Sequence, residues 1–183
     1  MSKFFIFALI TSITPGPNNS MLMASGIRFG RKKSLPHFCG IWLGFTFLFF
    51  IGGYLLTFVP EVIFEYLKYF GYVVITYIAY KVATTKSSSQ KTQGLEKPFT
   101  FIQASLFQWV NPKGVVMAVS GLTAFEITNF QGALIYFTIL PFSLGVWLFV
   151  GDGLQNWLKT NNTLERVVYV TLGLSMVGSL LLA

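Results

Sequence analysis

Residues 14–19 read Thr-Pro-Gly-Pro-Asn-Asn and interrupt an apolar stretch that extends from about Phe4 to Gly26. A proline lacks the backbone N–H, and its ring clashes with the carbonyl of the residue four positions earlier, so two prolines and a glycine cannot continue a regular helix. The pattern instead indicates that a new helix starts inside the stretch. We expect Thr14 to be its N-cap and Pro15 its first residue, because proline is favoured at the first helical position.

A second break of the same kind lies in the other half of the chain. Residues 111–114 read Asn-Pro-Lys-Gly in the middle of an apolar stretch from about Phe99 to Phe125. We expect Asn111 to be the N-cap and Pro112 the first residue of another helix that starts within this stretch. Two apolar stretches are therefore predicted to be broken helices, and the rest of the fold follows from them.

The composition places these stretches in a membrane. Of the 183 residues, 54% are hydrophobic and only 10% are charged, whereas about 25% of the residues in a soluble domain are charged. The mean hydropathy is +0.64. An ordinary water-soluble domain, collagen and low-complexity disorder are thereby excluded.

The inventory of catalytic and metal-binding side chains is nearly empty. The chain has a single cysteine, Cys39, and a single histidine, His37, so the sequence offers neither an internal disulfide nor a Cys/His zinc site. Serine–histidine–aspartate catalysis would have to rely on His37, which lies in a basic segment. We therefore expect no enzyme activity, no metal and no cofactor.

Six stretches are long enough to cross a bilayer. A hydrocarbon core about 30 Å thick requires roughly 20 apolar residues in a helix that rises about 1.5 Å per residue. The stretches that meet this requirement lie at about 4–26, 37–60, 64–83, 99–125, 132–151 and 164–183. The predicted fold class is an all-α polytopic membrane protein with six transmembrane helices.

The basic residues indicate the orientation. Ten of the 13 lysines and arginines lie in the loops after the first, third and fifth stretches, whereas Lys3 and Lys68 lie on the opposite side and Lys113 lies inside the fourth stretch. Cytoplasmic loops are enriched in Lys and Arg, so these loops are predicted to be cytoplasmic and both termini to lie outside the cytoplasm. The net charge of +7 thus reflects topology, and we expect no nucleic-acid partner.

The chain divides near its midpoint. Residues 84–98 form a linker rich in Ser, Thr, Gln and Lys, between a three-helix half at 1–83 and a second three-helix half at 99–183. Because three is an odd number, the second half must insert with the opposite orientation. Inverted halves with broken helices are the architecture of transporters whose substrate sites lie near the bilayer midplane. We predict a 3+3 inverted repeat in which helices 1 and 4 are broken.

The breaks supply the chemistry of a substrate site. A helix N-terminus within the membrane presents unpaired N–H groups and a partial positive charge, which favour a carboxylate. Lys113 adds a full positive charge, and Asn18 and Asn19 add amide groups. The alternatives are prolines that only shape the packing, and a lysine that pairs within the bundle or extends to the surface. The predicted substrate-binding residues are Thr14, Pro15, Gly16, Pro17, Asn18, Asn19, Gln108, Asn111, Pro112 and Lys113.

Acidic residues are few, and we expect none near the midplane. Asp152, between two glycines at the cytoplasmic end of the fifth stretch, is a candidate for proton coupling; the alternative is a solvated acid at a helix end. A cationic substrate side chain would require a carboxylate, so a neutral amino acid is favoured. Its ammonium group is expected to contact aromatic faces such as Trp109, or carbonyls that the breaks leave free.

These segments resemble a known family. Residues 15–19 (Pro-Gly-Pro-Asn-Asn), 30–33 (Gly-Arg-Lys-Lys) and 111–113 (Asn-Pro-Lys) are similar to the LysE/RhtB superfamily of bacterial amino-acid exporters. Within it, residues 13–19, and residues 94–98 leading to 107–111, resemble the exporters of cysteine and O-acetylserine. The resemblance covers nearly the whole chain, although the last two stretches share only hydropathy.

The resemblance implies a secondary transporter in the bacterial inner (plasma) membrane. Such a protein would export small amino acids or their derivatives from the cytoplasm, driven by the proton gradient. A bundle of six short helices also suits a homodimer. Two other functions remain open on the sequence: a channel for small solutes, because two half-helix starts that meet head to head also suit a pore, and a membrane subunit that does not itself transport.

Overall fold

The computed structural model describes residues 2–58, 60–85 and 96–182, and its secondary structure there is helical throughout. The described helices are α1 (Ser2–Ile13), α2 (Pro17–Phe29), α3 (Arg31–Phe58), α4 (Glu61–Ala83), α5 (Phe101–Val110), α6 (Pro112–Ala124), α7 (Asn129–Lys159), α8 (Asn162–Gly178) and a short 3-10 helix, η1 (Ser179–Leu182). The all-helical fold class is thereby confirmed. Residues 86–95 of the predicted linker lie outside the described residues.

Three of these helical segments are long and apolar enough to cross a membrane. They comprise Arg31–Gly52, Asn129–Lys159 and Asn162–Leu181. Large apolar side chains lie on the outside of the bundle, among them Phe142 (78% exposed) and Val73 (69% exposed). An apolar exterior of this kind fits a lipid environment, because soluble monomers rarely expose large contiguous apolar surfaces.

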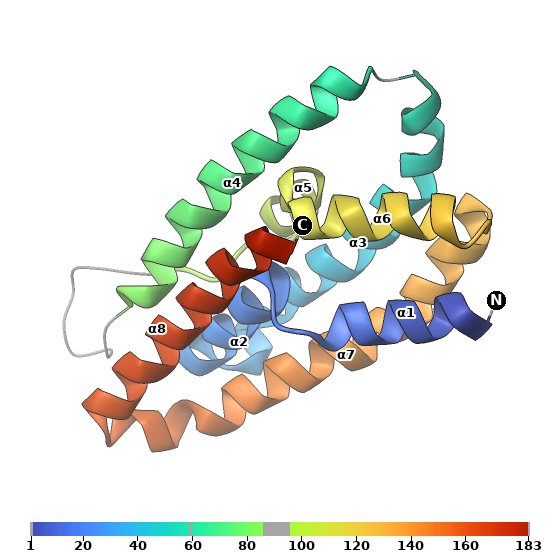
Figure 1. Ribbon diagram of the computed structural model, residues 1–183. Coiled ribbons are helices and arrows are strands. Elements are labelled where there is room, and N and C mark those ends of the chain that lie inside the picture. Colours follow the sequence, from blue (N-terminus) through green and yellow to red (C-terminus); the bar gives the residue numbers. More distant parts are fainter. Residues whose placement is uncertain (1, 59, 86–95, 183) are drawn as a thin grey trace.

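Both predicted breaks are present. The first apolar stretch forms α1 and α2 with residues 14–16 between them, and the second forms α5 and α6, which are separated only by Asn111. Figure 1 shows the extended connection between α1 and α2 and the change of direction between α5 and α6. The start of α6 is as predicted, with Asn111 at the N-cap and Pro112 at the first helical position.

The first break differs from the prediction by two residues. The N-cap of α2 is Gly16 and its first residue is Pro17, rather than Thr14 and Pro15. Thr14 instead belongs to the end of α1, since its backbone N–H donates to the carbonyl oxygen of Ile10 at 3.2 Å. The chain then runs extended through Gly16 (φ 173°, ψ −179°) before α2 begins. The predicted N-cap of the first break was therefore wrong.

The two halves of the chain pack on each other through close helix contacts. α2 lies along α7, α3 lies along α5, and α4 lies along α8 (Figure 1). A Cβ on Gly26 of α2 would lie 2.8 Å from the carbonyl oxygen of Leu148, and one on Gly40 of α3 would lie 2.5 Å from that of Phe101. Small residues allow helix backbones to approach this closely. Each broken helix is thus held against a long helix of the other half.

Aromatic side chains fill the bundle at the end that carries the N-terminus. The ring of Phe4 in α1 contacts those of Phe49 in α3, Phe125 and Tyr136 in α7, with centroids 6.0, 5.5 and 5.7 Å away. Phe4, Phe49 and Tyr136 are fully buried. These four residues are called the aromatic cluster below, and they close this end of the bundle.

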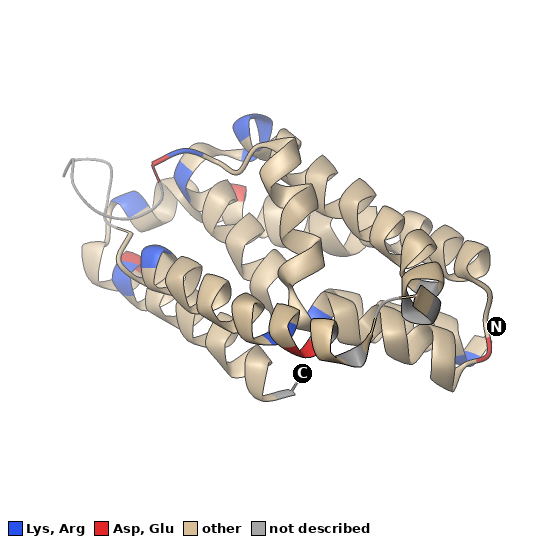
Figure 2. Ribbon diagram, turned by 90° about the horizontal axis from the view of Figure 1, so that it is seen from above, with Lys and Arg blue, Asp and Glu red and all other residues tan. Residues whose placement is uncertain are grey.

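Basic residues gather at the opposite end, which Figure 2 shows away from the N-terminus. The C-termini of α2, α4 and α7 and the N-termini of α3, α5 and α8 meet there. Its described lysines and arginines are Arg28, Arg31, Lys32, Lys33, Lys81, Lys97, Lys159 and Arg166. The basic loops that the sequence placed on one side thus lie at one end of the bundle, which is called the basic end below.

Candidate substrate site

The last carbonyls of α1 accept hydrogen bonds from other helices. The carbonyl oxygen of Ser12 accepts from Asn19 Nδ2 in α2 and from Ser143 Oγ in α7, both at 2.7 Å. The carbonyl oxygen of Ile13 accepts from Trp147 Nε1 in α7 at 3.1 Å. The last carbonyls of a helix have no intrahelical hydrogen-bond partners. Inside a membrane, other groups of the protein must donate to them.

Lys113 reaches the same helix end from α6. Its Nζ donates to the carbonyl oxygens of Thr14 (3.2 Å) and Pro15 (3.1 Å), and to Oγ1 of Thr14 (2.9 Å). A cation is favourable there because the C-terminus of a helix carries a partial negative charge. Gly16 leaves room for the lysine, since a Cβ at this position would lie 2.9 Å from Lys113 Nζ. The side chains that bind the end of α1, called the α1 clasp below, are those of Asn19, Lys113, Ser143 and Trp147.

A pair of amides joins the two breaks. Asn18, in the first turn of α2, and Gln108, in the last turn of α5, exchange two hydrogen bonds: Asn18 Nδ2 donates to Gln108 Oε1 (2.7 Å), and Gln108 Nε2 donates to Asn18 Oδ1 (3.2 Å). Gln108 is fully buried, and its Nε2 also donates to the carbonyl oxygen of Ala104 at 2.8 Å. Two residues that the sequence assigned to one site thus contact each other.

Asn111 is the least constrained polar side chain of the second break. It occupies the N-cap position of α6 but makes no side-chain capping bond. It is 1% exposed, and its Oδ1 has no hydrogen-bond partner among the described residues. Ser12 Oγ, in the last turn of α1, is buried and also lacks a partner in the described part of the chain. Buried polar atoms are rarely left unpaired, so these two atoms call for an explanation.

One small cavity lies between the breaks. Its volume is about 30 Å³, which leaves room for about two water molecules and less than an amino acid occupies. Its polar wall includes Thr11, Ser12, Asn18, Asn19, Asn111 and Lys113, and its apolar wall includes Ile41, Phe45, Met117, Leu140 and Leu144. The candidate site is therefore too small to hold an amino acid in this conformation.

Most of the predicted site residues line this cavity or bind a residue that does. Those that line it are Gly16, Pro17, Asn18, Asn19, Asn111 and Lys113. Thr14 and Pro15 bind Lys113, and Gln108 binds Asn18. Pro112 faces a separate apolar groove of about 450 Å³ between α3, α4 and α6, and Trp109 lines the same groove. The structure thus places the ring of Trp109 outside the small cavity.

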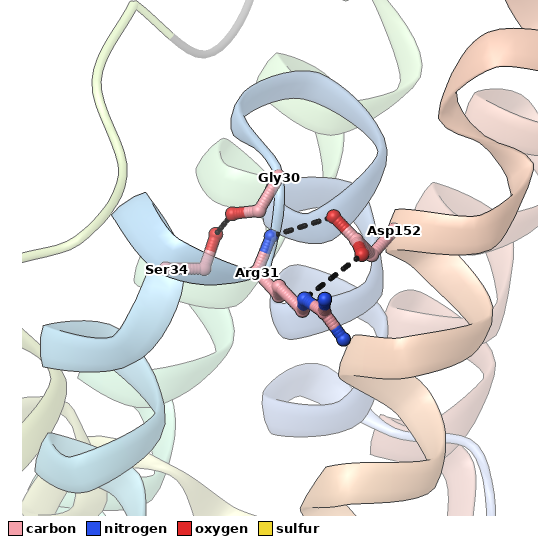
Figure 3. Close-up of polar contacts among 4 residues, drawn as sticks. All are labelled: Gly30, Arg31, Ser34 and Asp152. Atoms are coloured by element: carbon pink, nitrogen blue, oxygen red, sulfur yellow. Dashed lines mark hydrogen bonds and ion pairs between the residues drawn. The ribbon is translucent and has the colours of Figure 1, made fainter.

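Asp152 lies at the basic end, away from the cavity. Its Oδ1 accepts a hydrogen bond from the backbone N–H of Arg31, the first residue of α3, at 2.8 Å, and its Oδ2 lies 3.6 Å from Arg31 Nε (Figure 3). The carboxylate of α7 therefore caps the N-terminus of α3, where a negative charge is favourable. Gly30 makes the turn before α3 with a φ of 79°, a region that favours glycine.

The sequence did not point to three residues at the site, which are Ser12, Ser143 and Trp147. Ser143 is one of the few hydroxyl-bearing residues in the apolar part of α7, and this is the sequence feature that could have pointed to it. The bonds of Ser143 and Trp147 to the end of α1 join residues more than 130 positions apart. Pairing over such a distance depends on how the helices pack, which no local pattern shows.

The chain matches a model of the LysE type translocator family over residues 9–181. It is also similar to the cysteine/O-acetylserine efflux protein of Salmonella paratyphi A, at 28% identity over 134 residues, which are 72% of this chain and 68% of that protein. The protein of the same name from Escherichia coli strain K12 is 30% identical over 135 residues, with the same two shares. No solved structure matches the chain.

The matched region contains both breaks, the α1 clasp and the residues that line the small cavity. It therefore includes every feature of the candidate site, and it confirms the resemblance seen in the sequence motifs. From this match and from the similarity to the two efflux proteins, we conclude that the chain belongs to the family of LysE-type translocators.

Proposed function

We propose that the protein is a secondary transporter that exports small neutral α-amino acids, or derivatives such as O-acetylserine, from the bacterial cytoplasm and is driven by the proton gradient. The observation that carries this proposal is the meeting of two broken helices at one buried cavity. The starts of α2 and α6 bring partial positive charge to the cavity, and the end of α1 brings partial negative charge. The names of the two relatives give cysteine and O-acetylserine as what those proteins export.

We further propose that α1–α4 and α5–α8 are inverted repeats that together span the membrane six times. The packing supports this arrangement: α1 and α2 pack on α7, α5 and α6 pack on α3, and α4 packs on α8. Exchanging the two halves maps the contacts of α7 onto those of α3, and maps the contact between α4 and α8 onto itself. In this proposal the basic end faces the cytoplasm, because Lys and Arg are retained on that side, and both termini lie outside.

The small volume of the cavity favours a carrier over an open pore. The aromatic cluster closes the bundle on one side of the cavity, and the contact between Asp152 and Arg31 joins α7 to α3 on the other. A space of about 30 Å³ must expand before it can hold an amino acid. A carrier opens to one side at a time, so we expect the helices at one end to separate while the other end stays closed.

The walls of the cavity favour a neutral substrate. The described residues that line it include no Asp or Glu, so a substrate with a cationic side chain would find no opposite charge there. Apolar side chains, among them Met117 and Leu144, face the space that a substrate side chain would occupy. A short, uncharged side chain fits this wall.

Asp152 is the residue that we propose for proton coupling. Its carboxylate holds the start of α3 against α7 through the backbone N–H and the guanidinium of Arg31. Protonation would remove the negative charge that favours this position at a helix N-terminus. Proton binding would therefore weaken the contact and favour opening at the basic end.

An efflux experiment tests the proposed function. Bacteria that express the wild-type chain are compared with bacteria that express an Asn18→Ala, Lys113→Ala double variant at matched membrane levels, and metabolites in the medium are quantified by mass spectrometry. We expect one or a few neutral amino acids or their acetylated precursors, cysteine and O-acetylserine first, to rise only with the wild type. Equal metabolite profiles for the two strains would contradict amino-acid export.

Counterflow in proteoliposomes separates a carrier from a pore. Vesicles loaded with unlabelled cysteine are diluted into labelled cysteine. A carrier accumulates label transiently and saturates, whereas a channel only equilibrates the label. Saturable counterflow in the wild type that the double variant lacks is the result expected here.

A further inference from the structure

Two buried polar atoms at the cavity lack partners, and they come from opposite halves of the chain. Asn111 Oδ1 lies at the start of α6, and Ser12 Oγ lies in the last turn of α1. The two residues are 1% and 5% exposed, and both line the same cavity. Leaving a buried polar atom unpaired is unfavourable, so a site that holds two of them is suited to a ligand that pairs with both.

The other polar side chains of the cavity already have partners. Asn18 is bound to Gln108, and Asn19 donates to the carbonyl oxygens of Ser12 and Thr14. Lys113 is bound to Thr14 and Pro15. Thr11 Oγ1 donates to the carbonyl oxygen of Phe7 at 2.7 Å. Among the described residues that line the cavity, Ser12 and Asn111 are the ones with a fully buried side-chain atom that lacks a hydrogen-bond partner.

The charge at the end of α1 and the acceptor chemistry of Asn111 Oδ1 indicate which part of a substrate these two residues bind. An amide oxygen can only accept a hydrogen bond, so Asn111 Oδ1 requires a donor, although the start of α6 carries a partial positive charge that acts against a cation. Ser12 lies at the C-terminal end of α1, where the helix carries a partial negative charge. This helix end already holds one ammonium group, that of Lys113, at the carbonyls of Thr14 and Pro15. The N-terminal end of α2, with Gly16 as its N-cap beside Lys113, is the positive side of the cavity and favours a carboxylate.

We propose that Ser12 and Asn111 form the subsite for the α-ammonium group of the substrate. Ser12 Oγ and Asn111 Oδ1 each accept a hydrogen bond from the ammonium, while the substrate carboxylate lies at the start of α2. This assignment rests on the proposed function and deepens it, because it makes a free α-amino group the feature that is recognised. It also explains why Asn111 holds the N-cap position of α6 without capping that helix.

The test compares two ligands that share a carboxylate and a thiol but differ in the amino group. L-Cysteine and 3-mercaptopropionate, both kept reduced, are titrated into the purified wild-type protein, Ser12→Ala and Asn111→Leu, and binding is measured by calorimetry. We expect the wild type to bind cysteine at least about 10-fold more tightly than 3-mercaptopropionate, since hydrogen bonds to a charged group account for such a factor. We expect Asn111→Leu to weaken cysteine binding by about 10-fold or more, and Ser12→Ala by about 3- to 10-fold, while 3-mercaptopropionate changes by less than about 3-fold.

Ser25→Ala is the matched control. Ser25 is a buried serine of α2 whose Oγ lies 2.7 Å from Ser34 Oγ, and it does not line the cavity. Its replacement should leave the preference for cysteine over 3-mercaptopropionate unchanged. If Asn111→Leu does not fold, Asn111→Ser keeps an acceptor oxygen and is expected to retain part of the preference.

Three results would contradict a proposal made above. If Asn111→Leu and Ser12→Ala weaken the binding of cysteine and of 3-mercaptopropionate equally, these residues do not recognise the ammonium group. Unchanged cysteine binding in both variants would overturn the subsite as well. Wild-type protein that neither binds nor exchanges cysteine or any other neutral amino acid would instead contradict the proposed function.

Discussion

The two breaks are similar in sequence, but the protein completes them differently. At the first break, side chains from α2, α6 and α7 bind the carbonyl oxygens of residues 12–15. At the second break, Asn111 makes no capping bond and its Oδ1 has no partner among the described residues. The first break is thus fixed by contacts across the whole bundle and keeps one unpaired buried atom, Ser12 Oγ, whereas the N-cap side chain of the second break is not fixed by a capping bond. Bound carbonyls anchor the first break, and the substrate subsite proposed above takes one residue from each break.

The largest effect on stability and transport is expected from replacing Lys113, the charged residue of the α1 clasp. Lys113→Met keeps the length of the side chain but removes the three hydrogen bonds to Thr14 and Pro15. A hydrogen bond from a charged group contributes up to about 1.5–3 kcal/mol to the free energy of unfolding, so we expect a clear loss of stability. We also expect transport to fall to background, because the end of α1 would no longer be held beside the start of α6.

Lys68→Met is the matched control for this prediction. Lys68 is an exposed lysine of α4 whose Nζ lies 5.7 Å from the centre of the Tyr72 ring. Its replacement should change neither the thermal midpoint of the detergent-solubilised protein nor the rate of cysteine counterflow. Normal transport by Lys113→Met would remove the lysine from the mechanism.

The same substitution at the two breaks should have opposite consequences for stability. Asn19→Leu removes two donors from the carbonyl oxygens of Ser12 and Thr14, and we expect it to destabilise the protein by about 1–3 kcal/mol. Asn111→Leu removes a buried amide whose oxygen has no partner among the described residues, so we expect a change within about 1 kcal/mol, or a gain in stability. Thermal unfolding of both variants in the same detergent measures this difference. Equal destabilisation by the two variants would contradict the comparison between the breaks.

The positions of the breaks could be predicted from the sequence, because the cause is local. Prolines within apolar stretches interrupt helices wherever they lie, and the start of α6 at Pro112 followed from this rule alone. The predicted start of α2 was wrong by two residues, because Thr14 still belongs to the end of α1 and the chain then runs extended through Gly16. The local rule was applied to Pro15, the first of two prolines, whereas the helix starts at the second, Pro17.

The partners of the site residues could not be predicted in the same way. Lys113 was expected to offer its charge to a substrate beside the start of α6, yet its Nζ lies at the carbonyls of Thr14 and Pro15. This contact and the bond between Asn18 and Gln108 depend on which helices pack together. The sequence therefore named several residues around the cavity, though not Ser12. It did not show which of them bind other helices and which keep an unpaired atom.

The amide pair that joins the two breaks should show energetic coupling. Asn18→Leu leaves the buried amide of Gln108 without this partner, and Gln108→Leu leaves the half-buried amide of Asn18 without it. We expect each to destabilise the protein, by up to about 1–3 kcal/mol. The double variant should lose less than the sum of the two, with a coupling energy of about 0.5–1.5 kcal/mol. A double-mutant cycle on thermal stability measures this term. Strict additivity would show that the two amides do not support each other.

The smallest effect on stability, with a distinct effect on transport, is expected at Asp152. The carboxylate is 28% exposed, and in Asp152→Asn the side-chain oxygen can still accept from the backbone N–H of Arg31, so we expect a loss of no more than about 1 kcal/mol. The contact would, however, no longer respond to protonation. Cysteine transport into proteoliposomes, measured with and without a proton gradient, should therefore lose its dependence on the gradient, while Glu126→Gln, at an exposed acid of the opposite end, keeps it. If gradient-driven transport persists unchanged in Asp152→Asn, the carboxylate only caps α3, and the proton moves through the second break or elsewhere in the bundle.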